Sequence, residues 1–257
     1  MIHKGVILAG GHAKRMYPAT KVTNKHLLPI ATKPMIYYPI QTLMEAGIDE
    51  ILIVLGGNLK GEVLTVTSSE PDFKHVDFSY KVQVEAGGIA QALLLAKKFI
   101  GNEKFIVILG DNIFSSPITH FVNEFANNDK AKASILLKEV PDPERFGIAE
   151  LNDKGEVLSV EEKPEKPKSN LCVVGAYAYT PDVFNICASL KPSGRGELEI
   201  SDVQQHYIKQ QALIASKYDG HWTDAGTPYS YQRANLVALE NEMRHELLSE
   251  FKPKKSK

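Results

Sequence analysis

Short apolar segments alternate with segments of helical periodicity through the first half of the chain. Continuous apolar runs are typical of buried strands, and they lie at 5–9, 50–55 and 104–109; a further strand is predicted at 78–83. Apolar residues that recur every three or four positions predict helices, and they cover 34–47, 89–99 and 119–127. Strands that alternate with helices indicate a mostly parallel sheet with helices on its faces. The first half therefore predicts a Rossmann-like α/β fold.

The second half of the chain has a different pattern. Strands separated by charged breaks are predicted at 133–140, 146–151, 157–162 and 172–179, and helices at 199–211 and 229–250. We expect this β-rich part to lie beside the first sheet and to form the wall of a pocket. Because no repeat or low-complexity linker divides the chain, we expect a single domain. Its parts are one half over about 1–130, a second half over about 131–227, and a C-terminal helix with a basic tail over 228–257.

Composition and charge exclude several classes of protein. The 257 residues carry a formal charge of −1, and nucleic-acid binding usually needs a marked basic excess. No apolar stretch approaches the roughly 20 residues that span a bilayer, and the N-terminus lacks a signal-peptide pattern. Cys172 and Cys187 read as small buried hydrophobes in a reducing cytosol, with a disulfide as the alternative. We expect a cytoplasmic protein without nucleic-acid or membrane partners, and a solvated basic tail at 252–257.

The first predicted strand runs directly into Gly10 and Gly11, and the cations Lys14, Arg15 and Lys25 follow. Glycine lets the backbone approach a bulky anion, so that its N–H groups can face phosphate oxygens. Nearby lysines and arginines neutralise several negative charges at once. The spacing matches neither the P-loop nor the dinucleotide fingerprint. It predicts a triphosphate site of a third kind, and the alternative is a tight turn with solvated cations.

Two aspartates are candidate metal ligands. Asp111 follows the strand at 104–109, which places it at the same edge of the sheet as the glycine pair. Asp224 lies between Trp222 and Gly226. Carboxylates suit Mg²⁺ where phosphate oxygens supply the remaining ligands. The alternatives are a turn at Asp111 and a plain loop or a helix N-cap at Asp224.

Two further groups are candidates for substrate binding. Glu162 and Lys163 end a strand, where they could meet sugar hydroxyls and a monophosphate, although charged strand ends are also common on surfaces. Gln83 offers a donor and an acceptor together, which suits the imide edge of a pyrimidine, and the segment 87–91 would let a base lie against the backbone. An ordinary loop with Gln83 in solvent is the alternative. The sequence has no pair of histidines at metal-ligand spacing and no G-x-S-x-G nucleophile elbow. Interpretation as a metalloprotease or another hydrolase therefore lacks support.

Ordered segments along nearly the whole chain resemble the sugar-phosphate nucleotidyltransferases, and among them the short form of the glucose-1-phosphate thymidylyltransferases of deoxysugar and rhamnose synthesis. The segments are 8–18, 24–29, 33–39, 88–92, 109–112, 142–147, 161–164, 168–170, 195–202 and 222–226. The resemblance implies that dTTP and glucose 1-phosphate give dTDP-glucose and pyrophosphate with Mg²⁺. It also implies a homo-oligomer, a dimer or tetramer. UTP or another sugar 1-phosphate, and a non-catalytic nucleotide-sugar sensor, stay open as alternatives.

The resemblance also implies roles for individual residues, with the nucleotide in the first half and the sugar in the second. The implied catalytic residues are Arg15, Lys25 and Lys163. The implied nucleotide contacts are Leu8, Gly10, Gly11, Ala13, Lys14, His26, Gln83, Gly88, Asp111 and Asn112. The implied sugar contacts are Gly147, Glu162, Val173 and Tyr177, and the implied metal ligands are Asp111 and Asp224. The sequence departs from frequent family residues at Ala13-Lys14, His26 and Phe146.

Overall fold

The computed structural model of the protein describes residues 1–11, 13–56 and 60–250, with side chains up to residue 240. The strands are β1 (Lys4–Ala9), β2 (Pro29–Ile30), β3 (Lys33–Pro34), β4 (Glu50–Leu55), β5 (Asp77–Val82), β6 (Phe105–Leu109), β7 (Asn112–Phe114), β8 (Ala133–Glu139), β9 (Gly147–Leu151), β10 (Val157–Glu162), β11 (Leu171–Tyr179), β12 (Leu213–Lys217) and β13 (Trp222–Asp224). The α-helices are α1 (Tyr37–Glu45), α2 (Lys60–Ser69), α3 (Ile89–Leu94), α4 (Lys97–Ile100), α5 (Thr119–Ala126), α6 (Val183–Ser189), α7 (Ile200–Lys209) and α8 (Pro228–Glu250). Short 3-10 helices are η1 (Lys14–Met16), η2 (Ala19–Lys21), η3 (Lys25–Leu27), η4 (Pro71–Phe73) and η5 (Pro143–Arg145).

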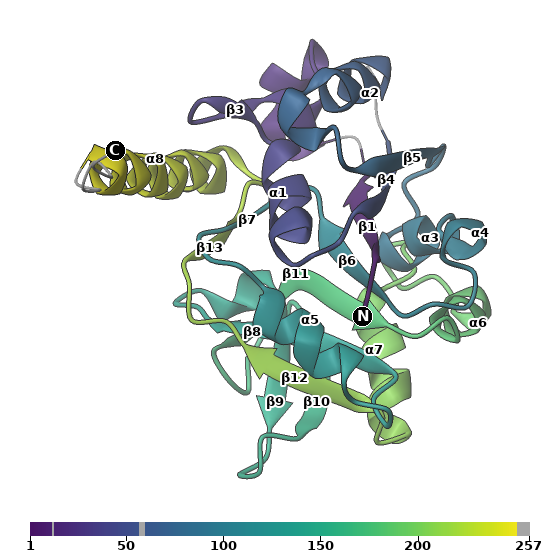
Figure 1. Cartoon of the computed structure of the whole chain (residues 1–257). Coiled ribbons are helices and arrows are strands. Elements are labelled where there is room, and N and C mark those ends of the chain that lie inside the picture. The colour runs from purple at the N-terminus through teal and green to yellow at the C-terminus, as the bar shows by residue number, and fades with distance from the viewer. Residues whose placement is uncertain (12, 57–59, 251–257) are drawn as a thin grey trace, which may run out of the picture.

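One nine-stranded sheet runs through the molecule (Figure 1). Its order is β10-β9-β11-β6-β1-β4-β5, with β8 beside β11 and β12 beside β8. The strands β6, β1, β4 and β5 are parallel, which confirms the predicted α/β fold class. In this register Leu8 lies beside Val54 and Leu109, so β1, β4 and β6 end at the same edge. The second half of the chain continues this sheet, because β11 pairs antiparallel with β6.

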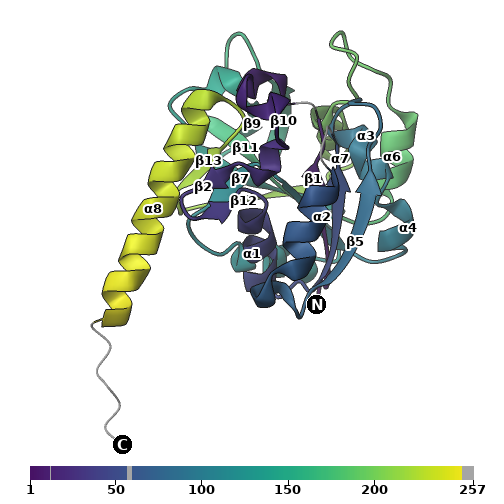
Figure 2. The same ribbon diagram turned by 90° about the horizontal axis from the view of Figure 1, so that it is seen from above.

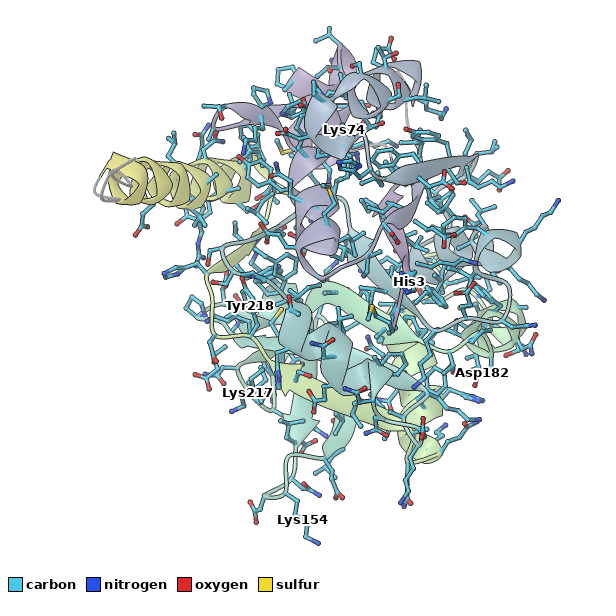
Figure 3. All side chains as sticks on the ribbon, in the orientation of Figure 1. His3, Lys74, Lys154, Asp182, Lys217 and Tyr218 are labelled. Atoms are coloured by element: carbon cyan, nitrogen blue, oxygen red, sulfur yellow. The ribbon has the colours of Figure 1, made fainter. Side chains whose placement is uncertain are left out.

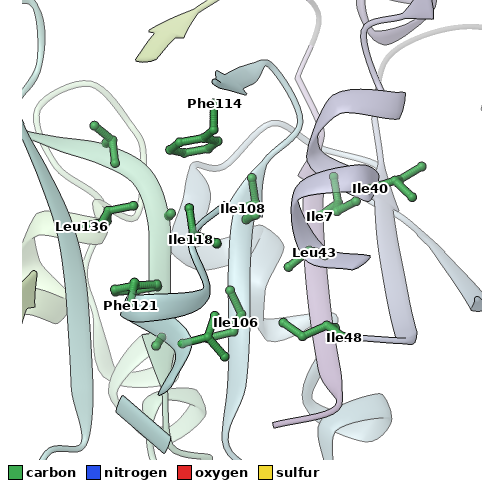
Figure 4. Packing of buried hydrophobic residues seen from close by; sticks show 14 of the residues in the cluster. Ile7, Ile40, Leu43, Ile48, Ile106, Ile108, Phe114, Ile118, Phe121 and Leu136 are labelled. Atoms are coloured by element: carbon green, nitrogen blue, oxygen red, sulfur yellow. The ribbon is translucent and has the colours of Figure 1, made fainter. Parts of the chain in front are cut away.

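Helices cover both faces of the sheet. On one face, α1 and α5 pack on side chains such as Ile7 and Ile108, as the close view of the packing shows (Figure 4). Val63 of α2 belongs to the same cluster. On the other face, α3, α6 and α7 pack on Val6 and Val107. Neighbouring residues of one strand therefore enter two different cores, and this explains why β1, β4 and β6 are apolar in continuous runs rather than at every second position. Seen from above, α8 runs along one flank and extends beyond the body (Figure 2).

Several element boundaries differ from the prediction. The expected helix at 34–47 begins only at Tyr37, because Pro34 pairs with Pro29 in the β2–β3 ribbon. The expected helix at 89–99 is divided into α3 and α4. The longer elements that were not predicted are α2, α6 and β12, and the short strands β2, β3, β7 and β13 were not predicted either. In α2 only Val63 and Thr67 are buried, so the segment lacks the apolar stripe that helical periodicity depends on.

The helix α8 packs on the body through Ala234 and Ala238, which are buried against a small apolar cluster that includes Met35 and Ile113. Within the described part of the chain, no helix combines the length and the apolar character needed to cross a bilayer. Both cysteines are free and buried, as expected. The predicted basic tail at 252–257 lies outside the described residues.

Lys104 closes the C-terminal end of α5. Its ammonium donates to the backbone oxygens of Phe125 (3.2 Å), Ala126 (3.4 Å) and Asn128 (3.0 Å). A cation at this end satisfies orphan carbonyls and interacts favourably with the helix dipole. We therefore expect Lys104→Met to lower the free energy of unfolding by about 1–2 kcal/mol in urea titrations. Lys98→Met, at an exposed position nearby, serves as the control, and equal losses in both variants would contradict this role.

Candidate active site

The glycine pair after β1 brings three backbone segments close together. A Cβ atom on Gly10 would lie 2.2 Å from Oε1 of Gln83, and one on Gly56 would lie 2.7 Å from the Cα atom of Gly10. Gly11 has a φ of +85°, a backbone conformation that residues other than glycine rarely adopt. The backbone at the ends of β1 and β4 is thus packed too tightly for side chains. The sequence pattern indicates that the glycine backbone comes close to a bound anion. In the structure this backbone is packed closely against other parts of the protein.

Asp111 lies directly after β6 and forms an ion pair with Lys25. The Nζ atom of Lys25 lies 2.6 Å from Oδ2 of Asp111, and Nδ2 of Asn112 donates to Oδ1 at 2.9 Å. Burial by itself would raise the pKa of the Asp111 carboxyl, but the charge and hydrogen bond of Lys25, together with smaller effects that include the hydrogen bond from Asn112, lower this pKa to about 2. Asp111 is therefore ionised at neutral pH.

Asp224 reaches the same place from the other end of the chain. The strands β7 and β13 form a ribbon in which Asp224 lies beside Asn112. The backbone N–H of Ala225 donates to the backbone oxygen of Asp111 at 2.8 Å. Asp224 does not cap α8, because the hydroxyl of Thr227 accepts from the N–H of Ser230 at the start of that helix. Burial and the charge of Asp111 raise the pKa of Asp224.

The two carboxylates surround a small space beside Gly226. A Cβ atom built on Gly226 would lie 2.7 Å from Oδ2 of Asp224, 3.2 Å from Nη2 of Arg15 and 3.5 Å from Oδ2 of Asp111. These hard oxygen donors fit Mg²⁺, which takes few protein ligands and completes its shell with phosphate oxygens and water. Among the residues that the structure describes, no cluster of three or more Asp, Glu, His and Cys side chains could hold a metal by itself.

A first cavity of about 280 Å³ opens in front of β1 and extends over α3. The residues around it that the sequence singled out are Leu8, Gly10, Gly11, Arg15, Lys25, His26, Gln83, Gly88 and Asp111. Gln83 is only 8% exposed and donates to Gln91 at 2.9 Å, so the alternative of a solvated glutamine is wrong. Ala13 and Lys14 belong to the adjoining loop and do not line this cavity.

A second cavity of about 410 Å³ lies over the second half of the sheet. The residues around it that the sequence singled out are Arg15, Asp111, Asn112, Gly147, Glu162, Lys163, Val173, Tyr177 and Asp224. Arg15 and Asp111 line both cavities, so the two spaces meet beside the candidate metal ligands. Asn112 is buried, and its Oδ1 accepts from Gly175 (3.0 Å) and Trp222 (2.7 Å), which fixes the floor between β7 and β11.

Sequence reasoning missed two arginines: Arg145, which lines the second cavity, and Arg195, which contacts Glu162 at that cavity. Arg195 holds Glu199 through contacts at 2.7 Å and 3.0 Å, and its Nη2 lies 3.6 Å from Oε1 of Glu162. Lys163 lies 3.6 Å from the same oxygen, so two cations flank Glu162. Arg145 bridges Asp142 at 2.6 Å and Asp224 at 3.7 Å. Both arginines stand in segments that carry the family resemblance, which was the available signal.

His26 is a neutral, buried side chain at the first cavity. Nδ2 of Asn24 donates to the backbone oxygen of Gly56 at 3.3 Å, and this hydrogen bond orients the Asn24 amide. Oδ1 of Asn24 therefore faces Nδ1 of His26 at 3.0 Å. Because Oδ1 only accepts, Nδ1 must carry the proton and the lone pair stays on Nε2. Burial, and then the charge of Lys25, lower the pKa of His26 to about 3, against a smaller opposing effect of Asp111.

This lowered pKa predicts a dependence of stability on pH. The unfolded chain protonates His26 below about pH 6.5, whereas the folded chain does so only near pH 3. The unfolded state therefore binds more protons between these values, and stability falls as the pH drops through this window. From pH 7 to pH 5, His26 should account for a loss of about 2 kcal/mol. Urea unfolding of the wild type and His26→Gln at both pH values would measure it, and parallel losses in the two proteins would contradict it.

Comparisons with known proteins agree with this geometry. Residues 4–241 match the nucleotidyl transferase family. The chain is 39% identical to a glucose-1-phosphate thymidylyltransferase from Neisseria meningitidis, over 90% of this chain and 81% of that relative. It is also 39% identical to a low-salt glycan biosynthesis nucleotidyltransferase from Haloferax volcanii, over 93% of this chain, which spans 66% of that relative's length. A crystal structure of a candidate glucose-1-phosphate thymidylyltransferase from Bacillus anthracis, in complex with a sucrose, matches with a TM-score of 0.86 at 48% identity, covering 92% of this chain and 95% of that one.

The protein therefore belongs to the nucleotidyl transferase family, and its mostly parallel sheet flanked by helices is the fold of that class. Within this family it is similar to the glucose-1-phosphate thymidylyltransferases over most of its length. The family resemblance that the sequence segments carry is thereby confirmed.

Proposed function

We propose that the protein joins dTTP and glucose 1-phosphate to give dTDP-glucose and pyrophosphate. The observation that carries this proposal is the junction of the two cavities, where Arg15 and Asp111 line both spaces and Asp224 lies beside them. A reaction between a nucleoside triphosphate and a sugar phosphate needs two adjoining pockets and cations where the phosphates meet. This arrangement supplies both.

On the nucleotide side, the backbone at Leu8, Gly10 and Gly11 lies where β1 ends, and its N–H groups would face the triphosphate. Gln83 and Gly88 would hold the thymine edge, because both line the same cavity as the glycine pair. The lone pair on Nε2 of His26 would accept from a hydroxyl of the nucleotide sugar. Ala13 and Lys14 would contact the nucleotide from the segment next to the cavity. Asn112 would act on the nucleotide indirectly, by fixing the carboxylate of Asp111.

On the sugar side, Gly147, Glu162, Val173 and Tyr177 line the second cavity and would surround the glucose ring. A Cβ atom on Gly147 would lie 3.3 Å from Oε2 of Glu162, so the space beside this carboxylate depends on a glycine. Lys163 would hold the sugar phosphate, and it stands close to Glu162 at the end of β10.

The chemistry needs little acid–base help, since a sugar phosphate has a second pKa near 6 and is already an anionic nucleophile at neutral pH. The barrier is the approach of two polyanions, which costs about 4 kcal/mol per pair of unit charges at 4 Å in an effective dielectric near 20. Arg15 and Lys25 would offset this repulsion on the triphosphate and on the departing pyrophosphate. Asp111 and Asp224 would hold Mg²⁺, which when bound stabilises negative charge on the phosphate oxygens.

Two alternatives differ from this proposal in chemistry or class. Thymine and uracil differ by one methyl group, which an apolar pocket distinguishes by only about 1–3 kcal/mol, so UTP and other sugar 1-phosphates are the nearest competitors. A non-catalytic sensor of nucleotide sugars is the other class. The convergence of Arg15, Lys25, Asp111 and Asp224 favours an enzyme, because a sensor has no need of groups aimed at a leaving pyrophosphate.

A pyrophosphate-release screen tests the proposal. The purified protein would be given each common nucleoside triphosphate with glucose 1-phosphate, and then dTTP with a series of sugar 1-phosphates. We expect the highest kcat/KM for dTTP with glucose 1-phosphate, followed by UTP. Release of pyrophosphate with no combination would support the sensor instead.

We also propose that the protein is a cytoplasmic homo-oligomer built from single-domain subunits. The two free, buried cysteines support a reducing compartment. The helix α8 exposes Tyr229, Leu236 and Leu239, and a second subunit could cover them. The remaining apolar positions predicted on this helix, Met243 and Leu247, lie among side chains that the structure does not describe. Light scattering at micromolar concentration should give a multiple of 28.5 kDa, and a mass equal to 28.5 kDa would refute oligomerisation.

A further inference from the structure

Both carboxylate oxygens of Asp111 already have partners. Oδ1 accepts from Nδ2 of Asn112 at 2.9 Å, and Oδ2 accepts from Nζ of Lys25 at 2.6 Å. Oδ2 is also the oxygen that faces the space beside Gly226, toward Asp224. A divalent cation between the two aspartates would therefore need the same oxygen that Lys25 holds.

Lys25 is firmly placed for this contact. It begins η3, and the side chain of Asn24 accepts from the N–H of His26 at 3.0 Å to fix the first residues of that turn. The side chains of Lys25 and Asp111 are only 12% and 18% exposed. Among the described residues Asp111 is the one anion paired with Lys25, and a buried ammonium leaves such a partner at a large cost in free energy unless another anion replaces it.

We propose that Lys25 locks the metal site, so that a divalent cation enters together with the nucleotide and not before it. This inference rests on the proposed function in one respect: the phosphates of a bound nucleotide are the anions that would draw the Lys25 ammonium away from Asp111. Since the described residues place only two carboxylates at this point, the site gains both its free oxygen and its remaining ligands when the triphosphate arrives.

The test measures metal binding without turnover. Mn²⁺ would be titrated into the nucleotide-free protein at pH 7.5, with free Mn²⁺ followed by electron paramagnetic resonance. We expect weak binding to the wild type and at least tenfold tighter binding to Lys25→Met, in which Oδ2 of Asp111 is released. Lys25→Gln is a second neutral variant with the same expected gain, should the methionine variant fail to fold by circular dichroism.

Three controls separate a lock from a general electrostatic effect. Lys25→Arg keeps the cation and should bind Mn²⁺ as weakly as the wild type. Arg15→Met removes a cation whose Nη2 would lie 3.2 Å from a Cβ atom on Gly226 but which, among the described residues, forms no ion pair with either aspartate. It should give a much smaller gain. The double variant Lys25→Met/Asp111→Asn should lose the gain.

The proposal is overturned if the nucleotide-free wild type binds Mn²⁺ as tightly as Lys25→Met, or if Arg15→Met gains as much as Lys25→Met. Neither result depends on which nucleotide or sugar the protein uses. A pyrophosphate screen without any product would therefore refute the proposed function alone, and an unlocked metal site would refute this inference alone.

Discussion

Asparagine in place of Asp111 is expected to lower kcat by about a thousandfold or more and to leave the fold intact. The change keeps the shape of the side chain but removes the negative charge that faces Asp224, Arg15 and Lys25. Loss of a single group that stabilises transition-state charge costs about a hundredfold to a thousandfold in kcat, and a metal ligand of this kind also determines whether the metal binds. The proposed mechanism uses Asp111 for this purpose.

The measurement is steady-state release of pyrophosphate with saturating dTTP, glucose 1-phosphate and Mg²⁺. Asp153→Asn is the matched control, because Asp153 is exposed in the turn next to Lys154, which projects from the molecule (Figure 3). Circular dichroism would check that both variants are folded. An Asp111→Asn protein with activity within tenfold of the wild type, or full wild-type activity in excess chelator, would rule out the metal role.

Alanine in place of Lys163 is expected to raise the KM for glucose 1-phosphate by about 10- to 100-fold and to change the KM for dTTP little. One charge-assisted hydrogen bond contributes about 1.5–3 kcal/mol, and Lys163 lies only in the second cavity. The backbone of Lys163 has a φ of +47°, a strain that alanine shares, so the substitution removes the ammonium without relaxing the turn.

Arg15→Ala provides the contrast, because Arg15 lines both cavities. Its charge should matter most when negative charge builds up on the leaving pyrophosphate, so this variant should chiefly lower kcat. Initial rates with each substrate varied in turn would separate the two effects. If Lys163→Ala weakened only dTTP, the division into a nucleotide cavity and a sugar cavity would be wrong.

The central strands, and the edge of the sheet where the site lies, could be predicted from the local pattern of apolar residues and glycines. The apolar runs of β1, β4 and β6 indicated strands buried on both faces, and the packing of Ile7 on one face and Val6 on the other explains why. The position of the glycine pair and Asp111 at one edge followed from a general rule for parallel sheets. Helix boundaries were less predictable, because the residues around Pro34 respond to pairing with Pro29 rather than to their own periodicity.

The protonation state of His26 shows where sequence reasoning stops. A histidine in a polar segment gives no sign that it is buried, yet burial and then the charge of Lys25 lower its pKa to about 3 and hold it neutral. Arg195 is similar: its approach to Glu162 depends on how the segment before α7 lies against β10. Such contacts depend on distance in space, which spacing along the chain does not encode.

The sequence by itself determined the main strands of the first half and the residue types that stand at their ends, because apolar periodicity and glycine act over a few residues. Only the tertiary structure decided that Asp111 and Asp224 share one space and that Lys25 holds the oxygen between them. The three-residue strands β7 and β13 are too short to be recognised alone, and they exist because residues 112 and 224 pair across the fold. Local preference cannot fix such a pairing; burial of the ribbon between the sheet and α8 does.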